Sequence, residues 1–569
     1  MSTTTGHDTY TLEIIKSALT AIGDEMFAAL RRTSMSPIIY EALDYSVGVT
    51  DRNGDLIAQG NGTTVFLGMI DSLVRDILTK FGPDNDICPG DVFISNDPYE
   101  GGGTHLSDVA LAKPVFFAGQ LVGFTVNKAH WVDVGGMWPG SYTTDSTEIF
   151  QEGLQLPTIK IIAGGTPVRA LIEILQSNIR MPEASMGDFW AGIAANNVGE
   201  TRLVALFEKY GRDAVFAAMD ELLDYGERMI AAELKKLPKG EFCAEDWIDD
   251  DGVSADPLKV CVKVAITDEK FSVDFSGSAP QAIGPINNSR TGLVSAVRTI
   301  FKALTNPQIP ANGGCFRALE VICPDHTVFT AKRPAPTSTY WETMLYAEDL
   351  IWKALARHVP ERLTAGHVLS VCAVILTSRH PHTGESTILV GPLIGGWGAM
   401  HNRDGLNGQF SVADGETYNI PVEIIEARYG VTVEQYAFHN EDGGEGRYRG
   451  GKGICFDIRL HAAEASFTGS FGRFKYPPWG IDGGRDGSRN YFEVLRGGAQ
   501  AEGDGREIYG KAAQLKIRKG DVLRWVTATG GGWGDPRKRS DEALARDLKN
   551  GFVTEDQVRR YYRPDANAE

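Results

Sequence analysis

The chain has 569 residues, of which 42% are hydrophobic and 23% charged, proportions that are ordinary for a globular protein of two to four structural units or one large one. Its net charge of -18 argues against binding to nucleic acid or to an anionic membrane surface, because phosphate groups would be repelled. The scattered cysteines exclude a disulfide framework, and neither a signal peptide nor a membrane-spanning apolar run is visible, so we expect a cytoplasmic protein.

The first half of the chain is dominated by segments whose apolar residues recur at helical spacing. We predict helices over 9–33, 63–82, 167–178 and 186–237. The second of them is expected to stop at Gly82, because glycine commonly ends helices. Between the helices, residues 43–60 and 108–130 alternate around tight turns, which predicts two hairpins.

The second half is richer in strand patterns and in glycine. Residues 258–278 alternate, helical spacing returns near 290–305 and 342–358, and short strands with glycine turns dominate after residue 385. Residues 540–562 predict a pair of short helices, with Ser540 as the N-cap of the first.

These patterns predict an α+β fold rather than a regular βαβ alternation. We expect a helix-rich half with a metal-bearing hairpin over 1–240, a β-rich half with glycine turns over 241–537, and a helical tail over 538–569. The 65 glycines fall in short bursts, which permit sharp turns or a close approach of the backbone to a ligand. Ordinary tight turns of a β-rich protein are the alternative.

A His-x-x-Asp pattern occurs twice, once at each end of the predicted hairpin over 108–130. The stretch "GGGTHLSDV" carries His105 and Asp108, and "NKAHWVDVGG" carries His130 and Asp133. Histidine with carboxylate is a common ligand set for Zn, Mn and Fe ions, so the paired copies predict a divalent metal site. For either histidine alone, a hydrogen-bonded turn residue is the alternative.

Asp44 is a further candidate ligand, because it sits in an apolar strand pattern where a buried carboxylate needs a partner or an ion. The aromatic residues Trp138, Tyr340 and Trp341 are candidates for an apolar pocket, with core positions as the alternative. The chain has no P-loop, no G-x-S-x-G elbow and no H-E-x-x-H motif, so these enzyme templates do not apply.

Several motifs in order resemble the hydantoinase B family, whose members are subunits or parts of ATP-dependent hydantoinases, lactamases, oxoprolinases and acetone or acetophenone carboxylases. The resemblance covers nearly the whole chain and rests on these stretches: "NDPYEGGGTHLSDV", "AHWVDVGGMWPGS", "EIFQEGLQLP", "DFSGSAPQAIGPIN", "PANGGCFR", "EDGGEGRYRGGKG" and "GGGWGDP".

The resemblance implies a hetero-oligomeric complex with a larger hydantoinase A-type subunit, which binds ATP and phosphorylates the substrate. The absence of a nucleotide motif here agrees with that division. By motif position, the implied metal ligands are Asp44, His105, Asp108 and His130. His130 and Asp133 are the implied catalytic residues, with Asp133 as ligand, base or support.

Two reactions agree with the resemblance: opening of a phosphorylated cyclic amide by water, or carboxylation of an enol phosphate made from a ketone. Many family members have a second histidine where this chain has Trp131, which we expect to line a substrate pocket with Trp138. Trp131 and the aromatic-rich turns favour a ketone carboxylase of the acetophenone or acetone type. A hydantoinase, oxoprolinase or lactamase subunit is the alternative, and a scaffold with a structural metal is the third.

Overall fold

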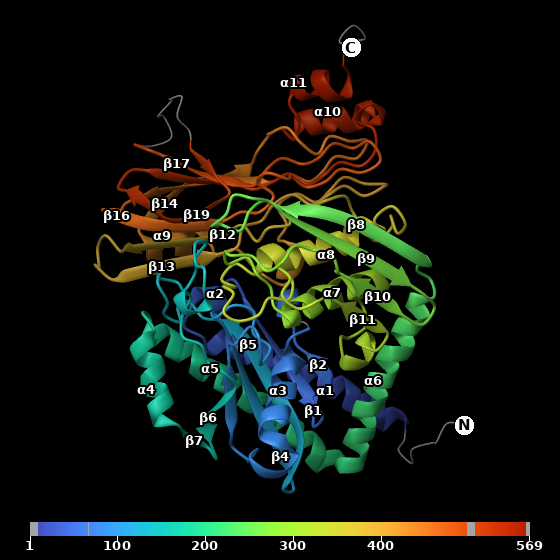
Figure 1. Cartoon of the computed structure of the whole chain (residues 1–569), viewed down its shortest axis with the longest axis vertical. Coiled ribbons are helices and arrows are strands. Elements are labelled where there is room, and N and C mark those ends of the chain that lie inside the picture. The colour runs from blue at the N-terminus through green and yellow to red at the C-terminus, as the bar shows by residue number, and fades with distance from the viewer. Residues whose placement is uncertain (1–8, 67, 498–506, 565–569) are drawn as a thin grey trace.

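The computed structural model describes residues 9–66, 68–497 and 507–564, and it confirms the predicted α+β class. In Figure 1 a sheet and helices from the N-terminal half lie at the bottom, the C-terminal strands lie above them, and the last short helices sit at the top. No helix in these described ranges is both long and apolar enough to cross a lipid bilayer.

A seven-stranded sheet forms the centre of the N-terminal half, with the strand order β2-β1-β5-β4-β3-β6-β7. Both predicted hairpins are present in it, as β1–β2 and as the long pair β4–β5. The strands are β1 (Tyr45–Asp51), β2 (Leu56–Gln59), β3 (Val92–Ser95), β4 (Asp108–Phe117), β5 (Gln120–His130), β6 (Ile159–Ala163) and β7 (Thr166–Pro167).

Helices cover both faces of this sheet. Successive side chains of a strand point to opposite faces, and both faces carry apolar residues that the helices bury. In β4, Ala110 and Ala112 belong to the core under α3, whereas Val109 and Leu111 pack with Phe189 of α5. The helices of this half are α1 (Thr9–Thr33), α2 (Pro37–Tyr40), α3 (Ile70–Asn85), α4 (Arg169–Asn178), α5 (Pro182–Tyr210) and α6 (Arg212–Leu234).

Helix α3 differs from its prediction at its N-terminal end. It begins at Ile70, because Thr64–Phe66 forms a separate turn, η1. At Gly82 the backbone leaves the helical conformation, with φ 62° and ψ 163°, and only a short helical segment to Asn85 follows the kink. Glycine adopts this conformation without a Cβ clash, so the regular helix stops at Gly82 as predicted.

The rest of the chain forms three smaller sheets and the helices between them. Their orders are β11-β10-β9-β8, β13-β12-β16-β19 and β14-β15-β20-β17-β18. The predicted division at residues 240 and 537 stays a prediction. The strands are β8 (Gly240–Ile248), β9 (Leu258–Ile266), β10 (Phe271–Asp274), β11 (Leu319–Ile322), β12 (Ala373–Arg379), β13 (Ser386–Gly391), β14 (Val431–Phe438), β15 (Ile454–Leu460), β16 (Glu464–Ser470), β17 (Tyr491–Leu495), β18 (Ile508–Tyr509), β19 (Lys511–Arg518) and β20 (Val522–Val526).

Helices of this part are α7 (Arg290–Thr305), α8 (Trp341–Leu355), α9 (Val422–Tyr429), α10 (Asp541–Lys549) and α11 (Glu555–Gln557). The Ser540 side chain accepts a hydrogen bond from the Ala543 amide, which confirms the predicted N-cap. Helix α9 was not predicted, since the sequence around it reads as short strands and turns.

Part of the glycine content serves close contact between backbone segments. A Cβ added at Gly450 would lie 1.9 Å from the carbonyl oxygen of Gly530, and one added at Gly530 would lie 2.1 Å from that of Trp397. Both distances are shorter than any real contact, so these segments approach one another only because they lack side chains.

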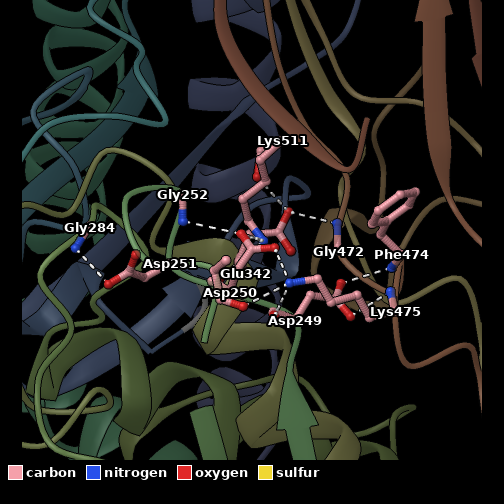
Figure 2. A network of polar contacts seen from close by, with 12 residues as sticks. Asp249, Asp250, Asp251, Gly252, Gly284, Glu342, Gly472, Phe474, Lys475 and Lys511 are labelled. Carbon is pink, nitrogen blue, oxygen red and sulfur yellow. Dashed lines mark hydrogen bonds and ion pairs between the residues drawn. The ribbon is translucent and has the colours of Figure 1, made fainter. Parts of the chain in front are cut away.

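A buried polar network joins α8 to the long β8–β9 hairpin and to the C-terminal sheets (Figure 2). Lys511 of β19 pairs with Asp250 at 3.3 Å, and Asp249 accepts the amides of Phe474 and Lys475 at 2.8 Å. Glu342 of α8 accepts a hydrogen bond from the Gly472 amide at 3.3 Å. The network fixes α8, whose first turn faces the site described next.

Candidate metal centre

The β4–β5 hairpin places two of the predicted ligands opposite each other. Asp108 is the first residue of β4 and His130 the last of β5, and they are register partners. The amide of His130 donates to the carbonyl of Asp44 at 3.1 Å, just before β1 begins. Three of the candidate residues therefore meet at one end of the sheet because of strand pairing alone.

His105 completes a tight cluster with Asp108 and His130. Its Nε2 lies 3.1 Å from Oδ1 of Asp108 and 3.2 Å from Nδ1 of His130, which is itself 3.3 Å from the same Oδ1. All three side chains are buried.

The donor set and its spacing fit a divalent ion. Two atoms bound to one tetrahedral ion at about 2.0–2.2 Å lie roughly 3.3–3.6 Å apart, close to the separations in this cluster. These three residues are the one group of metal-ligating side chains within 4.8 Å of one another that the described ranges contain. His130 Nε2, the ring nitrogen on the other side of the imidazole from these contacts, is buried without a hydrogen-bond partner there.

The second oxygen of Asp108 is held by hydroxyl groups. Tyr340 donates to Oδ2 at 3.2 Å, and Thr104 donates to the same oxygen. Burial raises the pKa of the Asp108 carboxyl, but His105, His130 and Lys128 outweigh it and hold this pKa well below the usual range. Asp108 is therefore ionised and keeps Oδ1 directed at both histidines.

His105 is oriented through its other ring nitrogen. Nδ1 lies 3.1 Å from the carbonyl oxygen of Ser338, a geometry in which Nδ1–H donates and Nε2 keeps its lone pair for the cluster. Glu152 in turn accepts the amides of Thr337 and Ser338 at 3.0 and 2.9 Å. Burial raises the pKa of Glu152 to about 7. Glu152 thus positions the turn that positions His105.

A cavity of about 60 Å³ adjoins the cluster. Its walls are mostly apolar, and the rings of Tyr142 and Trp341 stack on one another with centroids 5.3 Å apart. Trp341 is the first residue of α8, and Tyr340 precedes it. The other lining residues are Ile38, Asp44, Val65, Phe66, His105, Asp108, His130, Val371, Ala373, Ile375, Val390, Gly391, Pro392, Ala413, Asp414 and Thr417.

Two carboxyl groups outside the cluster line this cavity. Burial raises the pKa of Asp44 to about 7, with His130 opposing and Asp108 adding to the increase. Burial also raises the pKa of Asp414 to about 6. Of the described residues that line the cavity, none is a lysine or an arginine.

The remaining predicted residues lie away from the cavity. Asp133 accepts the amides of Gly135, Gly140 and Arg180 at 2.9 Å and pairs with the Arg180 side chain at 3.2 Å. Trp131 is buried against Phe189, on the α5 side of the sheet. Trp138 is half-buried and donates to Asp145 at 3.2 Å. The structure therefore brings together Asp44, His105, Asp108 and His130, but not Asp133, Trp131 or Trp138.

Sequence reasoning missed several residues of the site, among them Glu152, Asp414 and Thr417. Glu152 belongs to the stretch "EIFQEGLQLP", and a buried carboxylate in an apolar context was a usable signal for it. Asp414 and Thr417 come from a loop around η4 (Val412–Asp414), far along the chain. No motif marks that loop, so only the folded chain reveals it.

The chain matches a known protein family along most of its length. Residues 8–536 match the family described as Hydantoinase B/oxoprolinase. The chain belongs to this family. Membership was predicted from ordered motifs alone, and it is confirmed.

Hydantoinase B relatives match along almost their whole length. A Pseudomonas sp. protein, provisionally named as the B-type subunit of a D-/L-hydantoinase, is 32% identical over 97% of this chain and 94% of its own. The crystal structure of the ATP-dependent caprolactamase from Pseudomonas jessenii superimposes with a TM-score of 0.90, at 28% identity, over 99% of this chain and 98% of that one. A nucleotide-free acetone carboxylase structure gives a TM-score of 0.89 over 98% and 79%, but at 19% identity it shows the shared fold alone.

Proposed function

We propose that this chain is the metal-bearing subunit of an ATP-dependent cyclic amide hydrolase, working with a hydantoinase A-type subunit that binds ATP. The observation that carries the proposal is the cavity, which joins a His-Asp-His cluster to two carboxyl groups and, among its described lining residues, to no lysine or arginine. This reverses the preference for a ketone carboxylase that the sequence favoured.

The two acids of the cavity support an amide rather than a ketone. A cyclic amide presents an N–H group, and ring opening requires one proton to leave the attacking water and another to reach the leaving nitrogen. Asp44 and Asp414 both line the cavity and could serve these two proton transfers. Carboxylation of an enol phosphate has no leaving nitrogen, so it gives the second acid no such proton to deliver.

The names of two relatives also support a cyclic amide as the substrate. The hydantoinase and caprolactamase proteins are named for cyclic amide substrates, and they match this chain over 94% or more of their own length. Their names describe subunits or ATP-dependent enzymes, which agrees with a partner that supplies the nucleotide site.

His105, Asp108 and His130 would hold the divalent ion, with Tyr340 fixing the orientation of Asp108. An ion held there would supply Lewis acidity, which would lower the pKa of a water molecule and favour the ionised form of Asp44. Asp44 lines the cavity without joining the ligand cluster. We therefore assign it the role of general base, which accepts a proton from the attacking water. Asp133 plays no part, since its oxygens are engaged elsewhere.

The cavity is smaller than a pocket that holds a substrate. About 60 Å³ is room for roughly two water molecules, well below the several hundred Å³ of a typical ligand pocket. Substrate binding therefore requires the walls to part. One of these walls is the contact between η1 and η4, where Thr64 Oγ1 donates to the Val412 carbonyl at 2.8 Å.

Ketone carboxylation remains a second candidate, because the stacked Tyr142 and Trp341 give the cavity an apolar aromatic wall. The test uses the complex with its A-type subunit and follows ATP cleavage. We expect turnover of a lactam or hydantoin without bicarbonate. Turnover that requires both a ketone and bicarbonate would replace our proposal with the carboxylase.

A further inference from the structure

Asp414 is the acidic residue of the cavity that comes from the C-terminal half of the chain. It ends η4, and the loop is fastened to the first half by the amide of Tyr418, which donates to the Ala42 carbonyl at 3.0 Å. Two residues beyond Ala42 lies Asp44. The loop thus carries a carboxyl group into the cavity from a different element than the metal-binding hairpin.

The two oxygens of Asp414 differ in their partners. Ser411 Oγ donates to Oδ2 at 2.6 Å, whereas Oδ1 accepts no hydrogen bond from the described residues. Because Asp414 lines the cavity, this oxygen is available to a bound molecule.

Within the described part of the chain, no cation neutralises Asp414. The titratable groups that interact with it are Asp44, Glu348 of α8 and the buried thiol of Cys372, all of them acids. Glu348 is fully buried, and neither of its oxygens has a partner within the described ranges. Burial raises the pKa of Glu348 well above its usual range, so it stays protonated. These surroundings favour the protonated form of Asp414 as well.

We infer that Asp414 is the general acid of the reaction, and that it gives its proton to the ring nitrogen when the cyclic amide opens. The inference rests on the proposed function. It divides the two cavity acids between the two proton transfers: Asp44 receives a proton from the attacking water, and Asp414 delivers one to the leaving nitrogen.

The step balances at the leaving nitrogen. Once water has added to the amide carbon, the C–N bond breaks and its electron pair goes to nitrogen. The O–H bond of Asp414 breaks and an N–H bond forms, which leaves Asp414 as a carboxylate. Solvent then returns to Asp414 the proton that Asp44 took from water. The phosphoryl group that the A-type subunit placed on the carbonyl oxygen stays on the new carboxyl group as an acyl phosphate, and a second water molecule cleaves it to carboxylate and inorganic phosphate.

The experiment compares Asp414→Asn with Glu416→Gln in the complex with the A-type subunit. Glu416 is exposed in the same loop, so it is the matched control. We expect Asp414→Asn to open the ring roughly 100-fold or more slowly, in the range of general acid catalysis. ATP cleavage, metal content and assembly should be retained, so the number of rings opened per ATP falls. Glu416→Gln should match the wild type.

A pH profile separates an acid from a merely structural residue. A general acid works only when protonated, so kcat of the wild type should fall as the pH rises through the pKa of Asp414. That limb should be missing in Asp414→Asn. In Ser411→Ala it should remain but move to higher pH, because the hydrogen bond that this change removes lowers the pKa of Asp414.

Three outcomes decide the matter. Wild-type ring opening in Asp414→Asn, or an unchanged alkaline limb, overturns the role of Asp414 and leaves the hydrolase intact. A wild-type complex that opens no cyclic amide overturns the hydrolase and this inference with it. If Asp414→Asn fails to assemble, an alkaline limb that moves to higher pH in the Ser411→Ala complex supports the inference, and a limb that stays at its wild-type position refutes it.

Discussion

The two His-x-x-Asp copies share a spacing and flank one hairpin, yet the structure uses them differently. In the first copy both residues join the cluster, with His105 Nε2 at 3.1 Å from Asp108 Oδ1. In the second, His130 joins the cluster while Asp133 turns away to three amides and Arg180.

The difference comes from where each aspartate stands relative to its strand. Asp108 opens β4 and is paired across the hairpin with His130, and a turn in which its amide donates to the His105 carbonyl at 3.1 Å folds His105 back over it. Asp133 follows the end of β5, so no hydrogen bonds between paired strands hold it near the cluster. Identical spacing thus gives a ligand when pairing fixes the carboxylate and a structural anchor when it does not.

Removing a metal ligand of the first copy should have the largest effect on turnover. His105→Ala should lower turnover by about three orders of magnitude, because loss of the ion removes several kcal/mol of transition-state stabilisation. Elemental analysis of the purified complex should show less than one equivalent of a divalent metal, with the complex still assembled. Full activity with no metal would leave the ion without a catalytic role.

Loosening the support of His105 should have an intermediate effect. Glu152→Gln replaces an acceptor of two amides with a side chain that presents an NH₂ group, so the turn at Ser338 and the His105 ring lose their fixed position. We expect metal affinity to fall roughly 10- to 100-fold, as measured by competition with a chelator. Wild-type affinity would show that the turn is held by other contacts.

Changing Asp133 should have the smallest effect on turnover. Asp133→Asn weakens the bonds to three amides and Arg180, so we expect the free energy of unfolding to fall by about 1–3 kcal/mol. Metal content and turnover per folded molecule should stay within about twofold of the wild type, since local capping bonds do not reach the cluster. A selective loss of turnover, measured beside thermal unfolding, would return Asp133 to the active site.

Much of the local structure follows from the sequence for simple reasons. Apolar spacing predicted α1 and α5, tight turns predicted the hairpins, and Ser540 predicted a cap. Gly82 predicted the break in α3, because glycine adopts a non-helical conformation there without a Cβ clash.

By itself, the sequence determined the family, the α+β class, and the hairpin that brings His105, Asp108 and His130 together, because strand pairing and side-chain alternation are local properties. Only the tertiary structure decided that Trp131 faces α5 and that Asp133 is an anchor. It alone added Asp414, which stands far along the chain from the ligands, and Glu152, which acts on His105 only through Thr337 and Ser338 of the other half. Such contacts depend on side-chain direction and packing between distant elements, which no spacing along the chain records.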